Sequence, residues 1–284
     1  MLGIASRYCD EREVSTDYRR ALHRVATSMA TSGITPSTVQ DSSFNEWLGS
    51  LRGSATTRSN YRRMALTLWR AAIDSGLTTH CIGRVKKIKA PLPPPVAWSG
   101  NEIGQLLDHI DTMRGEFLSG CKHRPYWRAW VLLGYESGLR FGDLHQLRCS
   151  SVRGSRLTVL QHKTKQPIAK RLSPECVDAL HQLVPLSPDG TIFKWALSRR
   201  WVIVLFKGVC AAAGLEGSTK WLRRSGATAV EMVSPGSAQR FLGHLSPGLA
   251  QKHYIDQSLL ADRCPCPPPI SQSRTQDREL ASAS

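Results

Sequence analysis

The chain has 284 residues, 41% of them hydrophobic, and carries 38 Lys and Arg against 22 Asp and Glu, a formal net charge of +16. The apolar content excludes wholesale disorder, no run approaches the roughly 20 apolar residues of a membrane-spanning helix, and eight irregularly spaced cysteines do not form a secreted disulfide framework. We therefore expect a cytoplasmic protein with no membrane contact, and its charge indicates a polyanionic partner, most simply nucleic acid.

A proline-rich segment divides the chain. The sequence KAPLPPPVA at 89–97 holds four prolines, and because proline fixes φ and lacks a backbone donor, it predicts an extended linker at 90–98. Residues 1–90 carry 14 basic and 7 acidic side chains, and residues 91–262 carry 21 and 13. Both sides of the linker are therefore basic, and we expect both to face the same polyanion.

The segment before the linker, 1–89, is predicted to be a small helical domain that binds nucleic acid. Apolar residues at helical spacing predict helices over 15–31, 43–51 and 55–75. Arg58, Arg62 and Arg63 can share one face of the third helix, and Lys86 and Lys87 follow in a basic run before the prolines. These five side chains are candidate phosphate contacts, and an ordinary solvated face is the alternative interpretation.

The segment after the linker, 99–262, is predicted to be a second domain, mainly α with a small antiparallel β-sheet. It starts with a capping box, Ser99 to Glu102, and two short strands flank a Lys-Thr-Lys-Gln turn. The strands are expected at 156–161 and 167–172, and the helices at 101–117, 124–137, 174–183, 197–213, 219–232, 237–242 and 247–253. The tryptophans at 127, 130, 195, 201 and 221 are expected to anchor the core, and the low-complexity tail at 263–284 is expected to be disordered.

Four local stretches of this second domain stand out together. The first, ESGLRFGDLHQL at 136–147, has an arginine in a turn between two helices; the hairpin QHKTKQ at 161–166 follows; then come KWLRRSGAT at 220–228 and LGHLSPGLAQKHYI at 242–255. In this order and at these distances, they resemble the motifs of the tyrosine recombinases, the family of phage integrases and bacterial chromosome-dimer resolvases. The resemblance covers the chain from the helical first domain to Tyr254. It implies that the first domain is a core-binding domain and that the second is the catalytic domain.

The resemblance implies a set of catalytic residues: Arg140, Lys163, Lys220, Arg223, His244 and Tyr254. It also assigns Asp143 as the acidic residue that supports the first turn. Two departures stand out, since Lys220 replaces the usual histidine and His244 precedes Tyr254 by ten residues, one more than is commonest. Lys163 and Lys165 compete for the role of hairpin lysine, and Tyr254 is the only tyrosine after residue 135.

The chemistry that the resemblance implies fits these residue types. A tyrosine hydroxyl can form a 3′-phosphotyrosyl link that preserves the energy of the phosphodiester, two arginines can clamp the non-bridging oxygens, and a lysine can protonate the departing 5′-oxygen. No metal or cofactor is then required. The implied partner is double-stranded DNA at the nucleoid. Protomers that are monomeric when free are expected to form a homotetramer on synapsed sites, and a helix at 255–262 is a candidate contact between them.

Two alternative functions remain open at this point. A type IB topoisomerase-like enzyme would use the same phosphotyrosyl link to relax supercoils, without a specific site or partner protomers. A DNA-binding regulator would keep the fold without the reaction, an interpretation that the departure at Lys220 and the ten-residue spacing allow.

Overall fold

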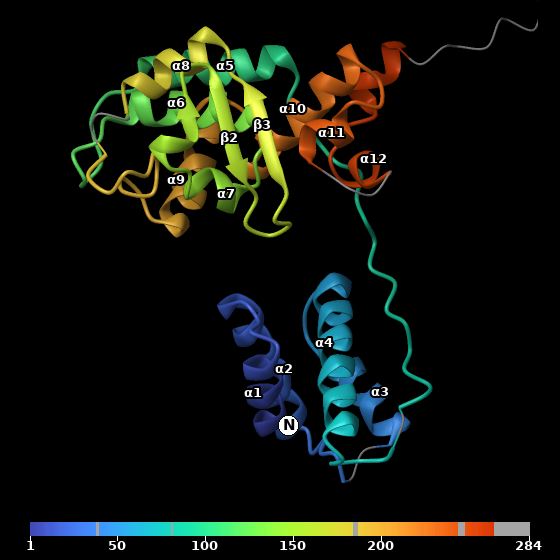
Figure 1. The fold of residues 1–284 in the computed structure, drawn as a ribbon. Coiled ribbons are helices and arrows are strands. Elements are labelled where there is room, and N and C mark those ends of the chain that lie inside the picture. The colour runs from blue at the N-terminus through green and yellow to red at the C-terminus, as the bar shows by residue number, and fades with distance from the viewer. Residues whose placement is uncertain (38–39, 81, 184–186, 244–247, 264–284) are drawn as a thin grey trace, which may run out of the picture. The chain divides into compact units, whose positions relative to one another are not determined.

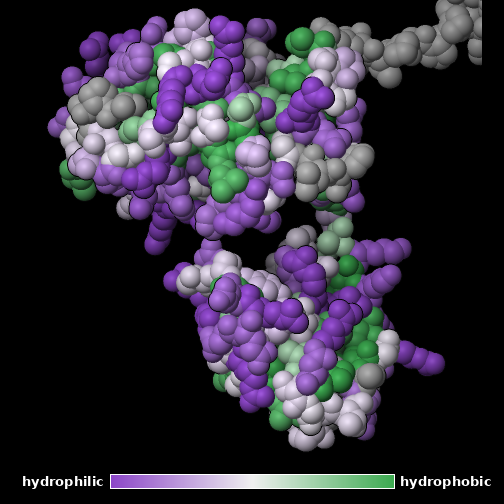
Figure 2. Space-filling model, in the orientation of Figure 1, coloured by the Kyte–Doolittle hydropathy of each residue, from purple (hydrophilic) through white to green (hydrophobic). Residues whose placement is uncertain are grey.

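The computed structural model describes residues 1–37, 40–80, 82–183, 187–243 and 248–263. The chain divides into two compact units, Met1–Pro93 and Pro94–Ser284, which Figure 1 shows as ribbons. Within the described ranges, no helix is both long and apolar enough to cross a membrane. All five cysteines in these ranges are free thiols, and Figure 2 shows hydrophilic residues over most of the visible surface, interrupted by smaller apolar patches.

The first unit is a bundle of four helices: α1 (Leu2–Glu11), α2 (Thr16–Thr31), α3 (Asp41–Ser50) and α4 (Ala55–Asp74). Ser15 and Ser54 cap α2 and α4, each accepting from a backbone N–H three residues on, which satisfies donors that a helix start leaves open. The bundle encloses one apolar core that includes Leu22, Phe44 and Leu68, all fully buried. Each such side chain contributes about 1.5–3 kcal/mol through burial.

The second unit contains most of the regular structure. Its helices are α5 (Gly100–Thr112), α6 (His123–Ser137), α7 (Phe141–His145), α8 (Pro174–His181), α9 (Arg199–Ala212), α10 (Thr219–Val233), α11 (Ala238–Leu242) and α12 (Leu249–His253), with 3₁₀ turns η1 (Cys149–Ser151) and η3 (Ser258–Arg263). The predicted capping box at the start of α5 is present, with Ser99 and Glu102 bonding each other's backbone N–H groups. The fold is therefore mainly α with a small antiparallel sheet, and the predicted fold class is confirmed.

The sheet has three antiparallel strands in the order β1 (Val152–Arg153), β2 (Arg156–Leu160) and β3 (Pro167–Arg171). The register pairs Arg156 with Arg153 on one side and with Arg171 on the other, so three exposed arginines form a row across the sheet. We call this set the arginine row. Like charges directly opposite one another destabilise a sheet, and no described carboxylate forms an ion pair with any of the three.

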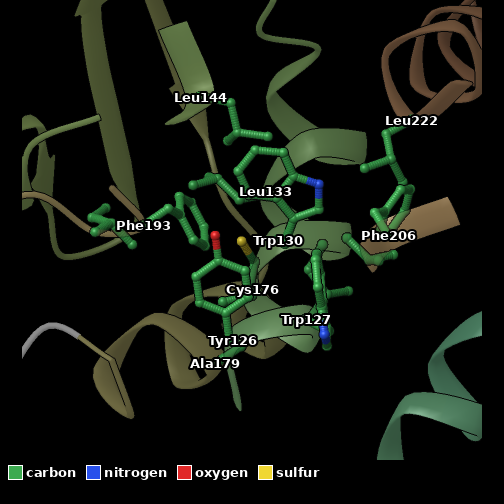
Figure 3. Packing of buried hydrophobic residues seen from close by; sticks show 14 of the residues in the cluster. Tyr126, Trp127, Trp130, Leu133, Leu144, Cys176, Ala179, Phe193, Phe206 and Leu222 are labelled. Atoms are coloured by element: carbon green, nitrogen blue, oxygen red, sulfur yellow. The ribbon is translucent and has the colours of Figure 1, made fainter. Parts of the chain in front are cut away.

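The core of the second unit centres on α6. Tyr126, Trp127 and Trp130 are almost fully buried there. Tyr126 packs edge-on against Trp127 and Phe193, Trp130 packs edge-on against Phe193, and the rings of Tyr126 and Trp130 are stacked (Figure 3). Such aromatic pairs add about 0.5–1.5 kcal/mol each beyond their buried area. A smaller cluster joins α10, α11 and α12, drawn in orange to red in Figure 1, around Ala227, Leu242 and Ile255.

Several element predictions were wrong in detail. The helix expected over 101–117 ends at Thr112, because its buried stripe ends at Ile110 and Met113 is already extended. Trp201, expected in the core, is 56% exposed, since α9 turns Val202, Phe206 and Val209 inward instead. The helix expected over 255–262 is a 3₁₀ turn that begins at Ser258. Helix α1 and strand β1 were not predicted, and the tail from 264 lies outside the described residues.

Candidate active site

Arg140 is positioned where α6 ends and α7 begins. Helix α6 stops at Gly138, which adopts the left-handed conformation with φ 59°; a Cβ there would also overlap the ring of Phe241. Arg140 follows as the extended N-cap residue of α7, and its Nη1 donates to Oε1 of Gln161 at 2.5 Å. The predicted Ser-Gly-Leu-Arg turn is therefore formed, and it directs the arginine toward the β2–β3 hairpin.

The hairpin turn is held by side chains on both sides of Lys163. Asp143, in the first turn of α7, accepts from the backbone N–H of His162 at 2.9 Å, and the Oγ1 of Thr164 donates at 2.6 Å to the same glutamine that Arg140 contacts. Lys163 itself is exposed. Asp143 thus supports the lysine turn directly, and the backbone of the turn is fixed beside Arg140 while the lysine side chain extends into solvent.

The second lysine of the turn has different surroundings. Lys165 has a positive φ of 53° and lines a hollow together with Asp143, Gln146 and Arg148. Lys163 does not line that hollow. The assignment of Lys163 as the hairpin lysine remains a prediction.

Arg223 is the most enclosed of the predicted catalytic residues that the structure describes. It lies on α10 with 4% of its surface exposed, and its guanidinium donates to the carbonyl of Gly138 and, at 3.1 Å, to the carbonyl of Leu242. These carbonyls lie at the C-terminal ends of α6 and α11, where the helix dipole favours a cation. Burial lowers the pKa of Arg223 to about 10, so the guanidinium remains charged at neutral pH.

Tyr254 lies directly against Arg223. The tyrosine ends α12, with its backbone N–H donating to the carbonyl of Ala250 at 2.9 Å. The Arg223 Cζ lies 4.8 Å from the centroid of the half-buried Tyr254 ring, within range of a cation–π interaction, and a side-chain hydrogen bond with Tyr254 raises the pKa of Arg223 against the effect of burial. The structure therefore brings together one predicted residue from each of the last two motifs.

Lys170, on β3, joins this group although it was not predicted. Its Nζ donates to the carbonyl of Phe241 at 2.6 Å and lies 4.1 Å from the centroid of that ring. Burial, followed by the charge of Arg223, lowers the pKa of Lys170 to about 8. The sequence carries a signal for this position. Lys170 follows the buried Ile168 by two residues, and because side chains two residues apart on a strand point to the same face, Lys170 lies on the inner face.

A buried carboxylate organises the helices that carry Tyr254. Glu231, on α10, is 7% exposed and accepts from the backbone N–H groups of Gly236 at 2.8 Å and Ala238 at 3.1 Å. It also accepts from the side chain of Gln251, on α12, at 2.8 Å. Glu231 follows Arg223 by eight residues, and this spacing places both side chains on the inner stripe of α10, so the sequence could have indicated that Glu231 is buried.

The remaining two catalytic candidates are Lys220 and His244. Lys220 is exposed in the first turn of α10, three residues before Arg223 and so on the same side of the helix. His244 lies outside the described residues.

In the first unit, Arg62 binds the segment that leads toward the linker. Its Nε donates to the carbonyl of Lys86 at 2.9 Å and its Nη2 to that of Val85 at 3.2 Å. Arg58 is half-buried and Arg63 is exposed on the same helix, and Lys86 and Lys87 are exposed. The predicted DNA contacts therefore gather along α4 and the segment after it, with Arg62 already engaged by backbone carbonyls.

Comparison with solved structures identifies the fold. A lambda integrase dimer bound to a COC′ core site superposes with a TM-score of 0.73 and 20% identity, covering 90% of this chain and 95% of that one. The chain has the fold of lambda integrase. The same protein as a tetramer bound to a Holliday junction gives a TM-score of 0.70 at 19% identity over 87% of this chain and 77% of that one. XerH site-specific recombinase bound to its difH substrate gives 0.66 at 16% identity over 92% and 84%.

The comparisons by sequence found no match. No family model matches the chain, and no curated protein matches it. With identities of 20% or less, the likeness to the integrase and to XerH concerns the fold.

Proposed function

We propose that this protein is a site-specific DNA recombinase of the tyrosine type, which cleaves and rejoins double-stranded DNA through a 3′-phosphotyrosyl intermediate. The observation that carries the proposal is the contact of the buried Arg223 guanidinium with Tyr254. A phosphate attacked by the tyrosine hydroxyl would form its new bond beside a fixed cation. The fold supports the proposal, since it is shared by lambda integrase, which was solved bound to a COC′ core site, and by the site-specific recombinase XerH, which was solved bound to its difH substrate.

In the proposed reaction, the Tyr254 hydroxyl oxygen forms a bond to the scissile phosphorus and loses its proton. The bond from phosphorus to the 5′-oxygen breaks, and Lys163 gives that oxygen a proton, which leaves a free 5′-hydroxyl. Arg140 and Arg223 neutralise the charge that develops on the non-bridging oxygens, and positioned donors of this kind lower the barrier because they need no reorganisation. Attack by a 5′-hydroxyl then reverses the steps and releases the tyrosine.

The remaining assignments belong to the same proposal. His244 would bond the scissile phosphate or help take up the tyrosine proton, and Lys220 would add a charged donor in place of the usual histidine. Arg58, Arg62, Arg63, Lys86 and Lys87 would contact the DNA backbone, where such contacts fix register without reading sequence. By analogy with the integrase tetramer on a Holliday junction, four protomers would join two synapsed sites. The proposed location is the cytoplasm, in association with the nucleoid, where the substrate is found.

The test traps the covalent intermediate. The protein is incubated with a library of nicked duplexes of randomised sequence, in which the cleaved fragment diffuses away, and adducts that survive SDS are collected and sequenced. The wild-type protein should form an adduct and Tyr254→Phe should form none, whereas Tyr135→Phe, a matched change within the same unit, should react normally. An adduct with Tyr254→Phe would show that another residue is the nucleophile, and no adduct with wild type would favour the regulator.

A second assay separates recombination from topoisomerase action. The sequence recovered from the adducts is placed on two duplexes of different length, and the products are examined for exchanged strands and for complexes that contain both duplexes. Recombination predicts both. Relaxation of supercoiled plasmids that lack the site, at the same rate as plasmids that carry it, would instead support the topoisomerase-like function.

A further inference from the structure

The end of the linker, residues 96–98, is fastened to the segments that carry Arg223 and Tyr254. The carbonyl of Val96 accepts from Arg224 at 3.4 Å, and the backbone N–H of Trp98 donates to the hydroxyl of Ser225 at 2.8 Å. Between them, the N–H of Ala97 donates to Oδ2 of Asp256 at 2.9 Å. Three successive linker residues therefore bond residues that follow Arg223 or Tyr254 in sequence by one or two positions.

Asp256 is the central residue of this arrangement. It is 7% exposed, and its other carboxylate oxygen accepts from the N–H of Ser258 at 3.0 Å and from its hydroxyl at 2.6 Å. A buried carboxylate is costly unless hydrogen bonds compensate it, and here Ala97 and Ser258 supply three. The carboxylate is thus committed to two backbone segments at once, the linker and the turn after the tyrosine.

Tyr254 is held on both sides by the same part of the molecule. The hydroxyl of Thr228, buried on α10, donates to the carbonyl of Tyr254 at 3.5 Å and accepts from the N–H of Asp256 at 3.1 Å. Any displacement of Asp256 must therefore move the backbone of Tyr254 or break the bonds of Thr228. Displacement of a reacting group by about 1 Å can cost on the order of a hundredfold in rate.

We propose that Asp256 is a positioning residue, which ties the backbone of Tyr254 to Ala97 of the linker so that the tyrosine is held in place for attack on the phosphate. The inference rests on the proposed function, because it gives Asp256 a role in that reaction. It also gives the linker a second role, because the linker joins the two units and its last residues hold the tyrosine in place.

The bond can be broken from either end. Asp256→Ala removes the acceptor, and Ala97→Pro removes the donor, because proline has no N–H, while the carboxylate stays in the chain. Ala90→Pro is the matched control, since it adds a proline to an exposed linker position and removes none of the bonds described above. With preformed DNA complexes, Asp256→Ala and Ala97→Pro should each slow adduct formation about tenfold to a hundredfold, with DNA affinity unchanged within about twofold.

If Asp256 and Ala97 act through one shared hydrogen bond, the effects of the two substitutions on the rate of adduct formation are not additive. The double variant should react no more slowly than the slower single variant, and Ala90→Pro should react at the wild-type rate. Multiplied rate losses in the double variant would show that the two residues act separately. Cleavage at the wild-type rate in Ala97→Pro, or an equal loss of DNA affinity and cleavage, would overturn the positioning role.

A second measurement does not depend on cleavage. Hydrogen exchange at the backbone N–H groups of Tyr254 and Ile255, both bonded to the carbonyl of Ala250, should be faster in Ala97→Pro and Asp256→Ala than in wild type or Ala90→Pro. Faster exchange in these variants of a protein that forms no adduct would support the link between Ala97 and the Tyr254 backbone through Asp256, while refuting the proposed function. Unchanged exchange would refute this link through Asp256, whether or not the protein forms the adduct.

Discussion

Replacement of Gly226 by alanine tests how closely α6 and α10 must pack. Gly226 is buried in the middle of α10, three residues after Arg223. A Cβ at this position would overlap the backbone carbonyl of Tyr135, on α6, and would also lie 3.2 Å from the Phe241 ring. Because a backbone carbonyl cannot rotate away as a side chain can, the two helices must separate to admit the methyl group.

The magnitude follows from two opposing contributions. Helix propensity favours alanine over glycine by about 1 kcal/mol, whereas overpacking of a close-packed core costs about 1–3 kcal/mol. We take the upper value, because the obstacle is backbone, and expect Gly226→Ala to lower the free energy of unfolding by about 2 kcal/mol. In a unit of this size the melting temperature should fall by about 4–8 °C.

The assay compares Gly226→Ala with Gly208→Ala by urea unfolding followed by tryptophan fluorescence. Only Trp47 and Trp69 of the eight tryptophans lie in the first unit, so the signal reports chiefly on the second. Gly208 is inside α9 with nothing within 4 Å of the position of its Cβ, and alanine there should stabilise by up to about 1 kcal/mol. If Gly226→Ala is as stable as Gly208→Ala, the packing argument is wrong.

Three further changes test electrostatics and buried polar groups. Arg156→Thr breaks the arginine row at its centre and should raise the free energy of unfolding by about 0.2–1 kcal/mol, and by less in concentrated salt; an unchanged or lower value would contradict the repulsion. Because its pKa falls from 10.5 to about 8 on folding, Lys170 is protonated more in the unfolded state between those values. Lys170 therefore contributes a rise in the free energy of unfolding with pH over that range, and in urea titrations at successive pH values the stability of wild type relative to Lys170→Met should rise with pH. Glu231→Ala strands the backbone donors of Gly236 and of the buried Ala238 and should lower the melting temperature, at a cost of about 1–3 kcal/mol; a melting temperature equal to wild type would mean that water replaces the carboxylate.

Much of the fold could be predicted because its signals are local. Ser99 and Glu102 form the predicted capping box, and the glycine of the Ser-Gly-Leu-Arg turn ends α6 in the left-handed conformation that glycine adopts at low cost. The contact between Arg223 and Tyr254 could be expected only from the resemblance. Nothing in the spacing of two residues on separate helices determines how α10 and α12 pack.

The misses have a common physical origin in tertiary packing. Apolar residues surround much of α9, so periodicity alone could not decide that Val202 faces inward while Trp201 faces solvent. Lys170 and Glu231 were passed over because charged residues are rarely buried without partners. Their partners are backbone groups of α11 and of the turn before it, together with the side chain of Gln251 on α12, and a sequence does not display these as a motif.

Strand β3 has a strand neighbour on one side only within the described sheet, and such edges can recruit strands from other molecules. Its first residue is Pro167, which has no backbone donor, and its last two are Lys170 and Arg171. Proline and positive charge on an edge strand both oppose pairing between copies. The arginine row therefore weakens the sheet within one molecule while it protects against aggregation, and we expect Arg171→Val to make concentrated samples form intermolecular β-structure.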